Sequence, residues 1–225
     1  MNTIELLAQI QQRHPQIASF SFHTFPAQQL IQQRMKEWGT KEEAHFHRAM
    51  QFRERYKLPF WDSVMLATFN YPDYSQKILR QCQTHNSIQG LFYATAADAY
   101  RLLHGLQDSS RLAVSSYVRM TDGSVSHLPM LDFHIPVSDI HTGVVKEVCR
   151  LLHLHDGYLL DSGESYHYIA SHTASWDELN LLLVRALRFS PIIDRAWISH
   201  QLEEKCCSLR IDRKHGVDTR VIEQL

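Results

Sequence analysis

Apolar and polar residues alternate most clearly between positions 131 and 135, where three apolar side chains enclose Asp132 and His134. Successive side chains of an extended strand point to opposite faces of a sheet. The pattern therefore predicts a strand that buries its apolar side chains on one face. Asp132 and His134 are expected to project together from the other face.

The same alternation, and apolar residues at helical spacing, predict the elements of the second half of the chain. The sequence Thr121-Asp-Gly-Ser124 between two strand patterns is typical of the tight turn of an antiparallel hairpin. Ser138 and Ser175 are each placed to cap a helix, and Glu178 completes a capping box. The expected strands cover residues 91–95, 112–120, 129–135, 158–160, 165–170 and 206–211, and the expected helices cover residues 96–106, 139–152 and 175–187.

The first part of the chain is predicted to be helical. Its apolar residues begin with a stripe at Ile4, Leu7 and Ile10, and a capping-box pattern opens at Thr40. These signals predict helices over residues 4–13, 28–38, 40–57 and 73–84, and a further helix that opens at residue 58. We therefore expect a helical N-terminal region over residues 1–86 and a second domain over residues 87–225. The order of elements in that domain indicates an α+β fold with a largely antiparallel or mixed sheet.

Composition and charge indicate the class of protein and its location but do not indicate an activity. The chain has 225 residues, of which 44% are hydrophobic and 21% charged, as in ordinary globular proteins. It has no apolar run of membrane-spanning length, so no transmembrane helix is expected. It has no basic secretory signal at its start and no paired-cysteine motif, so a reducing, cytoplasmic location is expected. The net charge of −1 gives no bulk attraction to nucleic acid, so any site for a polyanion must be local.

Four short segments carry side chains suited to chemistry. Asp132 and His134 are metal-capable residues two positions apart on one predicted strand. Farther along the chain lie a Ser-Gly turn leading into His167, a hydrophobic-Asp pair ending at Asp194, and a basic segment over residues 210–214. Each segment also has an ordinary structural explanation. Asp132 and His134 could belong to the polar face of a surface strand, and His167 could be a hydrogen-bonded histidine of a sheet. Asp194 could cap a helix, and the basic segment could be a solvated edge.

In this order and context the four segments resemble the archaeo-eukaryotic primase superfamily, the primase-polymerases. Asp132 falls on the first acidic position of that family's strand motif, and Ser165-Tyr-His167 falls on its Ser-x-His motif. Asp194 falls on the hydrophobic-Asp motif, and Leu-Arg-Ile at residues 209–211 is similar to a strand that many members carry. The resemblance covers residues 90–223 and implies a primase-like catalytic domain.

The resemblance implies nucleotidyl transfer from nucleoside triphosphates on a single-stranded nucleic-acid template. Divalent cations, Mn²⁺ or Mg²⁺, would activate the attacking hydroxyl and neutralise the triphosphate. The implied catalytic residues and metal ligands are Asp132, His134 and Asp194. The implied triphosphate contacts, which include backbone N–H groups of the Ser-Gly turn, come from Ser162, Ser165, His167, Arg210 and Lys214. A chain this short also implies a partner, such as a helicase or another replication or defence subunit.

One departure from the family pattern leaves different interpretations open. The second acidic position of the strand motif is occupied by His134, which replaces a metal-bridging carboxylate with a softer, neutral ligand. Either the site is active with an altered metal preference, or it has lost catalysis and keeps a nucleotide-binding or assembly role. A third interpretation is a mononuclear iron oxygenase with Asp132, His134 and His167 as ligands. Such enzymes have all-β folds, which the expected helices would interrupt.

Overall fold

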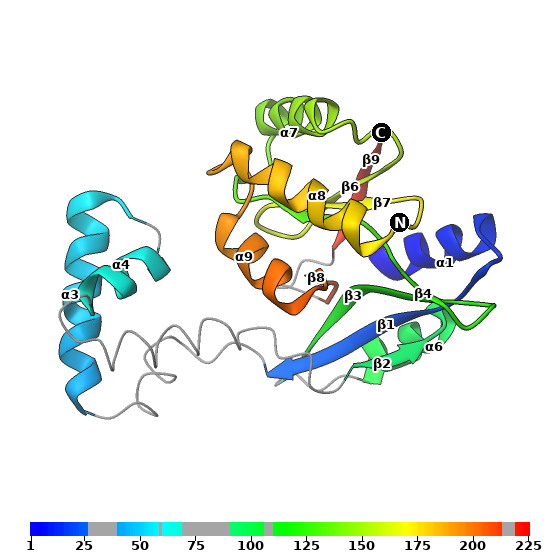
Figure 1. The fold of residues 1–225 in the computed structure, drawn as a ribbon, viewed down its shortest axis with the longest axis horizontal. Helices are drawn as coiled ribbons and strands as arrows, with labels where there is room; N and C mark the ends of the chain where they lie inside the picture. The colour runs from blue at the N-terminus through cyan, green and yellow to red at the C-terminus, as the bar shows by residue number, and fades with distance from the viewer. Residues whose placement is uncertain (27–39, 59, 69–90, 106–109, 213–218) are drawn as a thin grey trace. The chain divides into compact units, whose positions relative to one another are not determined.

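The computed structural model describes residues 1–26, 40–58, 60–68, 91–105, 110–212 and 219–225. The chain divides into two compact units, one formed by Met1–Phe25 together with Ile88–Leu225 and the other by Pro26–Ser87. The larger unit combines helices with antiparallel strands, which confirms the predicted α+β fold (Figure 1). The expected helical region over residues 1–86 needs correction, because the first 25 residues belong to the larger unit and include a strand.

The first sheet of the larger unit contains five strands, which are β1 (Ile17–Pro26), β2 (Phe92–Ala94), β3 (Ser110–Met120), β4 (Val125–His127) and β8 (Ser208–Arg210). Their order is β2-β1-β3-β4, with β8 also paired to β3. Besides its neighbour β1, strand β3 pairs with two further strands, since its first half pairs with β8 and its second half with β4. The predicted hairpin turn joins β3 to β4, and Gly123 there has a φ of +85°, which glycine adopts at little cost.

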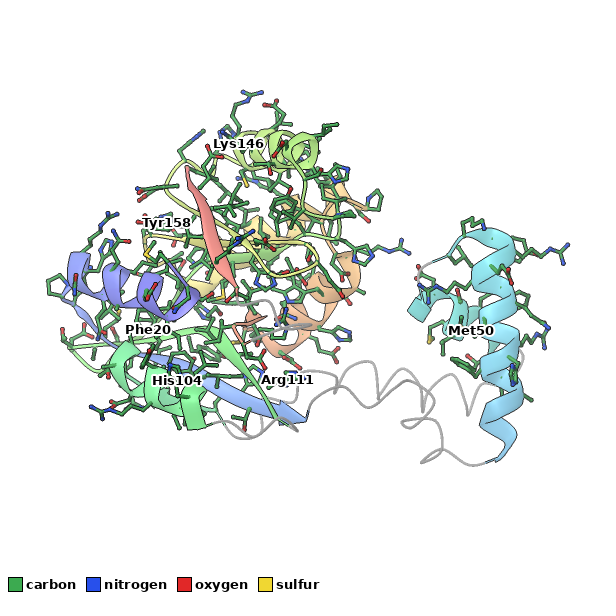
Figure 2. The ribbon with its side chains drawn as sticks, turned by 180° about the vertical axis from the view of Figure 1, so that it is seen from behind. Phe20, Met50, His104, Arg111, Lys146 and Tyr158 are labelled. Atoms are coloured by element: carbon green, nitrogen blue, oxygen red, sulfur yellow. The ribbon has the colours of Figure 1, made fainter. Side chains whose placement is uncertain are left out.

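Three strands, β1, β4 and β9 (Arg220–Gln224), were not predicted from the sequence, and β1 is the longest of them. A signal was present, because Phe20 and Phe22 alternate with serines. The alternation is short, and the polar residues Ser21 and His23 on the opposite face are buried as well. Phe20, labelled in Figure 2, is fully buried in the core of the larger unit.

The second sheet contains four antiparallel strands in the order β5-β7-β6-β9, which are β5 (Met130–Asp132), β6 (Gly157–Asp161), β7 (Tyr166–Ala170) and β9 (Arg220–Gln224). Only Leu128 and Pro129 separate β4 from β5, so the chain passes directly from one sheet into the other. Every residue of the central strands β6 and β7 is buried. These two strands are therefore covered on both faces, and they hold the neighbouring edge strand β5 in a fixed register.

The helices of the larger unit are α1 (Thr3–Arg13), α6 (Ala96–Gly105), α7 (Asp139–Leu151), α8 (Trp176–Ala186), the 3-10 helix η1 (Leu187–Phe189) and α9 (Arg195–Glu204). Both predicted caps are confirmed: the Ser138 side chain accepts a hydrogen bond at the start of α7, and Ser175 forms a capping box with Glu178 at the start of α8. Buried side chains from α1, α6, α7, α8, α9 and both sheets join one hydrophobic core.

The first residues of the chain contact the last strand. Asn2 forms a β-bridge with Arg220, and the Val221 N–H donates to the Met1 carbonyl oxygen at 2.9 Å. The hydroxyl oxygens of Thr3 and Thr219 are 2.7 Å apart in a buried hydrogen bond between residues 216 positions apart. Helix α1 is thereby fixed to β9 of the second sheet.

The smaller unit contains α3 (Thr40–Tyr56) and α4 (Phe60–Ala67), which confirm the helices predicted there. Ala49 of α3 and Val64 and Ala67 of α4 are buried where the two helices pack together. The helices predicted over residues 28–38 and 73–84 lie outside the described residues. Across the described part of the chain, no helix has the length and apolar character needed to span a membrane.

Candidate functional site

Asp132 and His167 meet at the edge of the second sheet. Asp132 ends β5, and the pairing of β5 with β7 places it directly opposite His167. Residues that oppose one another on neighbouring antiparallel strands are close enough for their side chains to interact. The His167 Nε2 lies 3.6 Å from the Asp132 Oδ1, and the histidine side chain is only 8% exposed. The fold therefore brings together two of the residues that the sequence motifs singled out.

Asp194 reaches the same edge through the backbone. Its N–H donates to the Asp132 carbonyl oxygen at 3.1 Å. Its Oδ1 accepts hydrogen bonds from the N–H groups of Ala196 and Trp197, at 2.8 and 3.0 Å, and so caps α9. The helix-cap explanation for Asp194 is confirmed, but it occupies only one oxygen. The second oxygen, Oδ2, is directed toward His134.

His134 lies beside Asp194 at the surface. The His134 N–H donates to the Ile192 carbonyl oxygen at 2.7 Å, which fixes the backbone. Its Nδ1 lies 3.8 Å from the Asp194 Oδ2, and its side chain is 74% exposed. The edge thus holds two pairs of side chains, Asp132 with His167 and His134 with Asp194.

The Ser-Gly turn between β6 and β7 is closed by its own hydrogen bonds. The Ser162 N–H and hydroxyl both donate to the Ser165 carbonyl oxygen, at 2.9 and 3.0 Å. Gly163 has a φ of +95°, and its N–H donates to the Asp161 carboxylate at 2.8 Å. Two N–H groups that were predicted to bind phosphate, those of Ser162 and Gly163, are therefore already used within the turn.

Arg210 is bound to the same turn. Its Nη2 donates to the Ser162 carbonyl oxygen at 2.7 Å, and its Nη1 donates to the backbone oxygen of Asp212. The Asp212 carboxylate lies 3.4 Å from the Arg210 Nη1 and 3.6 Å from the Nε of Arg111, which Figure 2 labels. The arginine that was predicted to contact phosphate is thus the centre of a largely buried network. Lys214 lies outside the described residues.

Burial controls the charges of this network. It lowers the pKa of the Arg210 guanidinium, while the carboxylates of Asp212 and Asp132 act to raise it. Burial also raises the pKa of the Asp212 carboxyl, against the influence of Arg210 and Arg111. Sequence reasoning missed the role of Asp212, although its position two residues after Arg210 in an extended segment was a usable signal. Nothing local in the sequence indicated Arg111.

The segment that holds these residues matches a family model. Residues 95–221, more than half of the chain, match the model described as Archaeo-eukaryotic primase 1D-like. The chain belongs to this primase-like family. The resemblance drawn from the sequence motifs is thereby confirmed. Comparisons with curated proteins and with solved structures gave no match. Both pairs of the sheet edge lie within the primase-like segment, whereas α1, β1, α3 and α4 lie outside it.

In this primase-like domain the side chains at the sheet edge suit a metal ion that is already bound to phosphate oxygens of a substrate. No group of three or more His, Cys, Asp or Glu side chains is arranged to hold a metal within the described ranges. Mg²⁺ at phosphoryl-transfer sites commonly takes one or two protein carboxylates and completes its coordination with phosphate oxygens and water. The carboxylates of Asp132 and Asp194 fit that pattern. The proposed iron ligands Asp132, His134 and His167 form no such three-residue group, so the oxygenase interpretation gains no support.

Proposed function

We propose that this primase-like protein transfers nucleotides from nucleoside triphosphates to a strand on a nucleic-acid template, with Mn²⁺ or Mg²⁺ as cofactor. The observation that carries the proposal is the backbone hydrogen bond between Asp132 and Asp194, which holds two carboxylates of the family motifs at one sheet edge. His167 of the Ser-x-His motif lies directly opposite Asp132. Two carboxylates with a neighbouring histidine suit a metal-bound triphosphate.

The two carboxylates differ in what they contribute to this reaction. Divalent ions, when bound, neutralise the triphosphate and activate the attacking hydroxyl of the strand. Asp194 would bind an ion through Oδ2, because Oδ1 accepts the N–H groups at the start of α9. Asp132 would bind an ion while it also orients His167, whose Nε2 faces its Oδ1. His134, exposed beside Asp194, would supply the remaining protein ligand and favour manganese.

The phosphate contacts follow from the same geometry. His167 would donate from its imidazole to a triphosphate oxygen, and the Ser162 and Ser165 hydroxyls lie in the turn that leads to it. Arg210 is a positioning residue in this proposal, since it donates to the Ser162 carbonyl oxygen and so holds the turn. Lys214 keeps its predicted role as a phosphate contact.

Calorimetric titration with a non-hydrolysable nucleoside triphosphate analogue in Mn²⁺ tests the proposal. Wild type is expected to bind only with the metal present. Asp132→Asn combined with Asp194→Asn is expected to abolish that binding, and asparagine preserves the cap of α9. The control, Asp139→Asn with Asp177→Asn, removes the same charge from the first turns of α7 and α8 and should bind like wild type. Absence of metal-dependent binding by wild type would refute the proposal.

One observation favours a second candidate, a catalytically inactive nucleotide-binding or assembly subunit. His134 occupies the position where the family motif has a carboxylate, so a ligand that bridges two metals is missing. Primer extension by wild type and by His134→Asp separates the candidates. Extension by wild type supports the enzyme. Extension by His134→Asp alone, with nucleotide binding retained in wild type, supports the inactive subunit.

A further inference from the structure

Helix α3 of the smaller unit carries arginine and aromatic side chains in a row. Arg48, Phe52 and Tyr56 follow one another at intervals of four residues, so they lie along one side of the helix. The Arg48 guanidinium carbon is 5.4 Å from the centre of the Phe52 ring, and that ring is 5.9 Å from the Tyr56 ring. The Arg55 guanidinium carbon is 5.4 Å from the centre of the Tyr56 ring. We name these four residues the α3 stripe.

Three of the four side chains of the α3 stripe are exposed, and the fourth, Phe52, is half-buried. Arg48 and Arg55 are exposed and Tyr56 is 51% exposed, whereas the neighbouring Ala49 is buried. Figure 2 shows the side chains of α3 projecting around the helix, with Met50 labelled. The described partners of the two arginines are the rings of Phe52 and Tyr56. Their charges are therefore not neutralised by those contacts.

Charge is concentrated around the α3 stripe. Between residues 44 and 57 the chain has four Lys or Arg side chains and one carboxylate, although the whole chain has a net charge of −1. All four of these cationic side chains are exposed. The local excess of positive charge is complementary to a polyanion, and its effect extends about 8–10 Å at physiological salt.

We propose that the α3 stripe binds single-stranded nucleic acid, with bases stacked on its rings and phosphates paired with its arginines. The exposed Tyr56 ring and the half-buried Phe52 ring lie beside guanidinium groups. Rings placed in this way recognise unstacked bases, which a duplex does not present. An acidic protein surface would use the charges but would not need the rings. The smaller unit lies outside residues 95–221, so this binding site is distinct from the family-matched segment. It adds a strand contact to the proposed function without depending on nucleotidyl transfer.

Fluorescence anisotropy with the full chain and labelled oligothymidylate or oligouridylate tests this proposal. The variant Arg48→Gln/Arg55→Gln/Tyr56→Ser is expected to bind about tenfold more weakly, because one stacking platform and two phosphate contacts are lost. The salt dependence should also decrease, by about 0.7 in the slope of log K against log salt for each phosphate contact removed. Comparison of the two oligomers shows which sugar the site prefers.

A matched control is provided by Arg101→Gln/Arg150→Gln/Tyr100→Ser. These residues of α6 and α7 are exposed, and each arginine pairs with a carboxylate three residues away. This control should bind within about twofold of wild type, since its two arginines already pair with carboxylates. Equal weakening by both triple variants, or binding of oligoglutamate as tight as that of the oligomers, would overturn the proposal. Asp132→Asn/Asp194→Asn should keep strand binding, so failure of the nucleotide site and failure of the α3 stripe are separate results.

Discussion

Two polar clusters of the larger unit contrast in how their side chains are used. At the edge of the second sheet, the side chains of Asp132 and His167 and of His134 and Asp194 face each other at 3.6 and 3.8 Å, longer than a hydrogen bond. The Arg210 guanidinium instead donates hydrogen bonds to backbone oxygens of the turn and of its own strand segment.

The contrast shows that residue type alone does not identify a binding group. Both clusters lie in the primase-like segment and both were predicted to contact the nucleotide or its metal. At the sheet edge the His134 side chain is 74% exposed, so it is accessible to a ligand. The Arg210 guanidinium instead forms hydrogen bonds within the protein, to the backbone oxygens of Ser162 and Asp212. We therefore expect substitutions at the sheet edge to affect binding, and substitutions in the Arg210 network to affect stability first.

The largest expected effect on stability comes from Arg210→Ala. It leaves the Asp212 carboxylate, 8% exposed, with the more distant Arg111 and the Leu112 backbone as partners, and it removes a donor from the Ser162 carbonyl oxygen. We expect the free energy of unfolding to fall by about 3 kcal/mol, as for other broken buried pairs. Urea denaturation monitored by circular dichroism measures it.

Arg220→Gln is the control for that experiment. Arg220 also pairs with a buried carboxylate, that of Asp161 at 3.2 Å, but its side chain is 67% exposed. The expected loss is below about 1 kcal/mol, because solvent screens an exposed pair. Equal losses for the two arginines would remove the distinction between the network and an ordinary surface pair.

Sequence reasoning succeeded where the information was local. The alternation around Asp132 and the serine caps of α7 and α8 are patterns within a few residues, and the structure confirms them. The predicted strand over residues 129–135 is shorter than expected, because β5 ends at Asp132 and His134 lies after it. The partners of Arg210 could not be predicted in the same way. Ser162 is 48 positions away along the chain, and only the packing of the two sheets brings the pair together. Strand β1 was missed because its alternation of phenylalanines with polar residues covers only a few positions.

Substitutions at Asp194 test the contrast between the sheet edge and the Arg210 network, because Asp194 both caps α9 and belongs to the proposed binding site. Asp194→Ala removes the cap of α9 and should lower the free energy of unfolding by about 1.5 kcal/mol. Asp194→Asn keeps an oxygen acceptor and should stay within a few tenths of a kcal/mol of wild type. Metal-dependent nucleotide binding should be lost in both. Retention of binding by Asp194→Asn would show that Asp194 is only a cap.

Glu204 ends α9, the helix that Asp194 caps, and its charged neighbour is of the opposite sign to those of Asp212. Both carboxyls are raised in pKa by burial, but the neighbour of Glu204 is Glu203, which raises the pKa of Glu204 further, to about 7. A carboxyl with a raised folded-state pKa costs stability as the pH rises from its unfolded value through its folded one. Glu204→Gln should therefore be more stable than wild type at pH 8, by about 1 kcal/mol after allowance for solvent screening.

The pH dependence distinguishes this effect from a change in packing. The difference in free energy of unfolding between Glu204→Gln and wild type should vanish below the ordinary glutamate pKa, where Glu204 is protonated in both states. The difference in free energy of unfolding should increase as the pH rises toward 7. Urea denaturation at several pH values measures it. A difference that is constant with pH would contradict the assignment.

The hydrogen bond between Thr3 and Thr219 has a consequence for how the protein is made. A ribosome releases α1 long before β9, yet α1 cannot complete its contacts until β9 has been synthesised, because the two threonines are 216 positions apart. Contacts between such distant segments slow folding and leave early segments exposed during synthesis. The buried stripe of α1 and the phenylalanines of β1 are thus apolar surface that a nascent chain presents for most of its translation. Those are the segments that we expect a chaperone to bind.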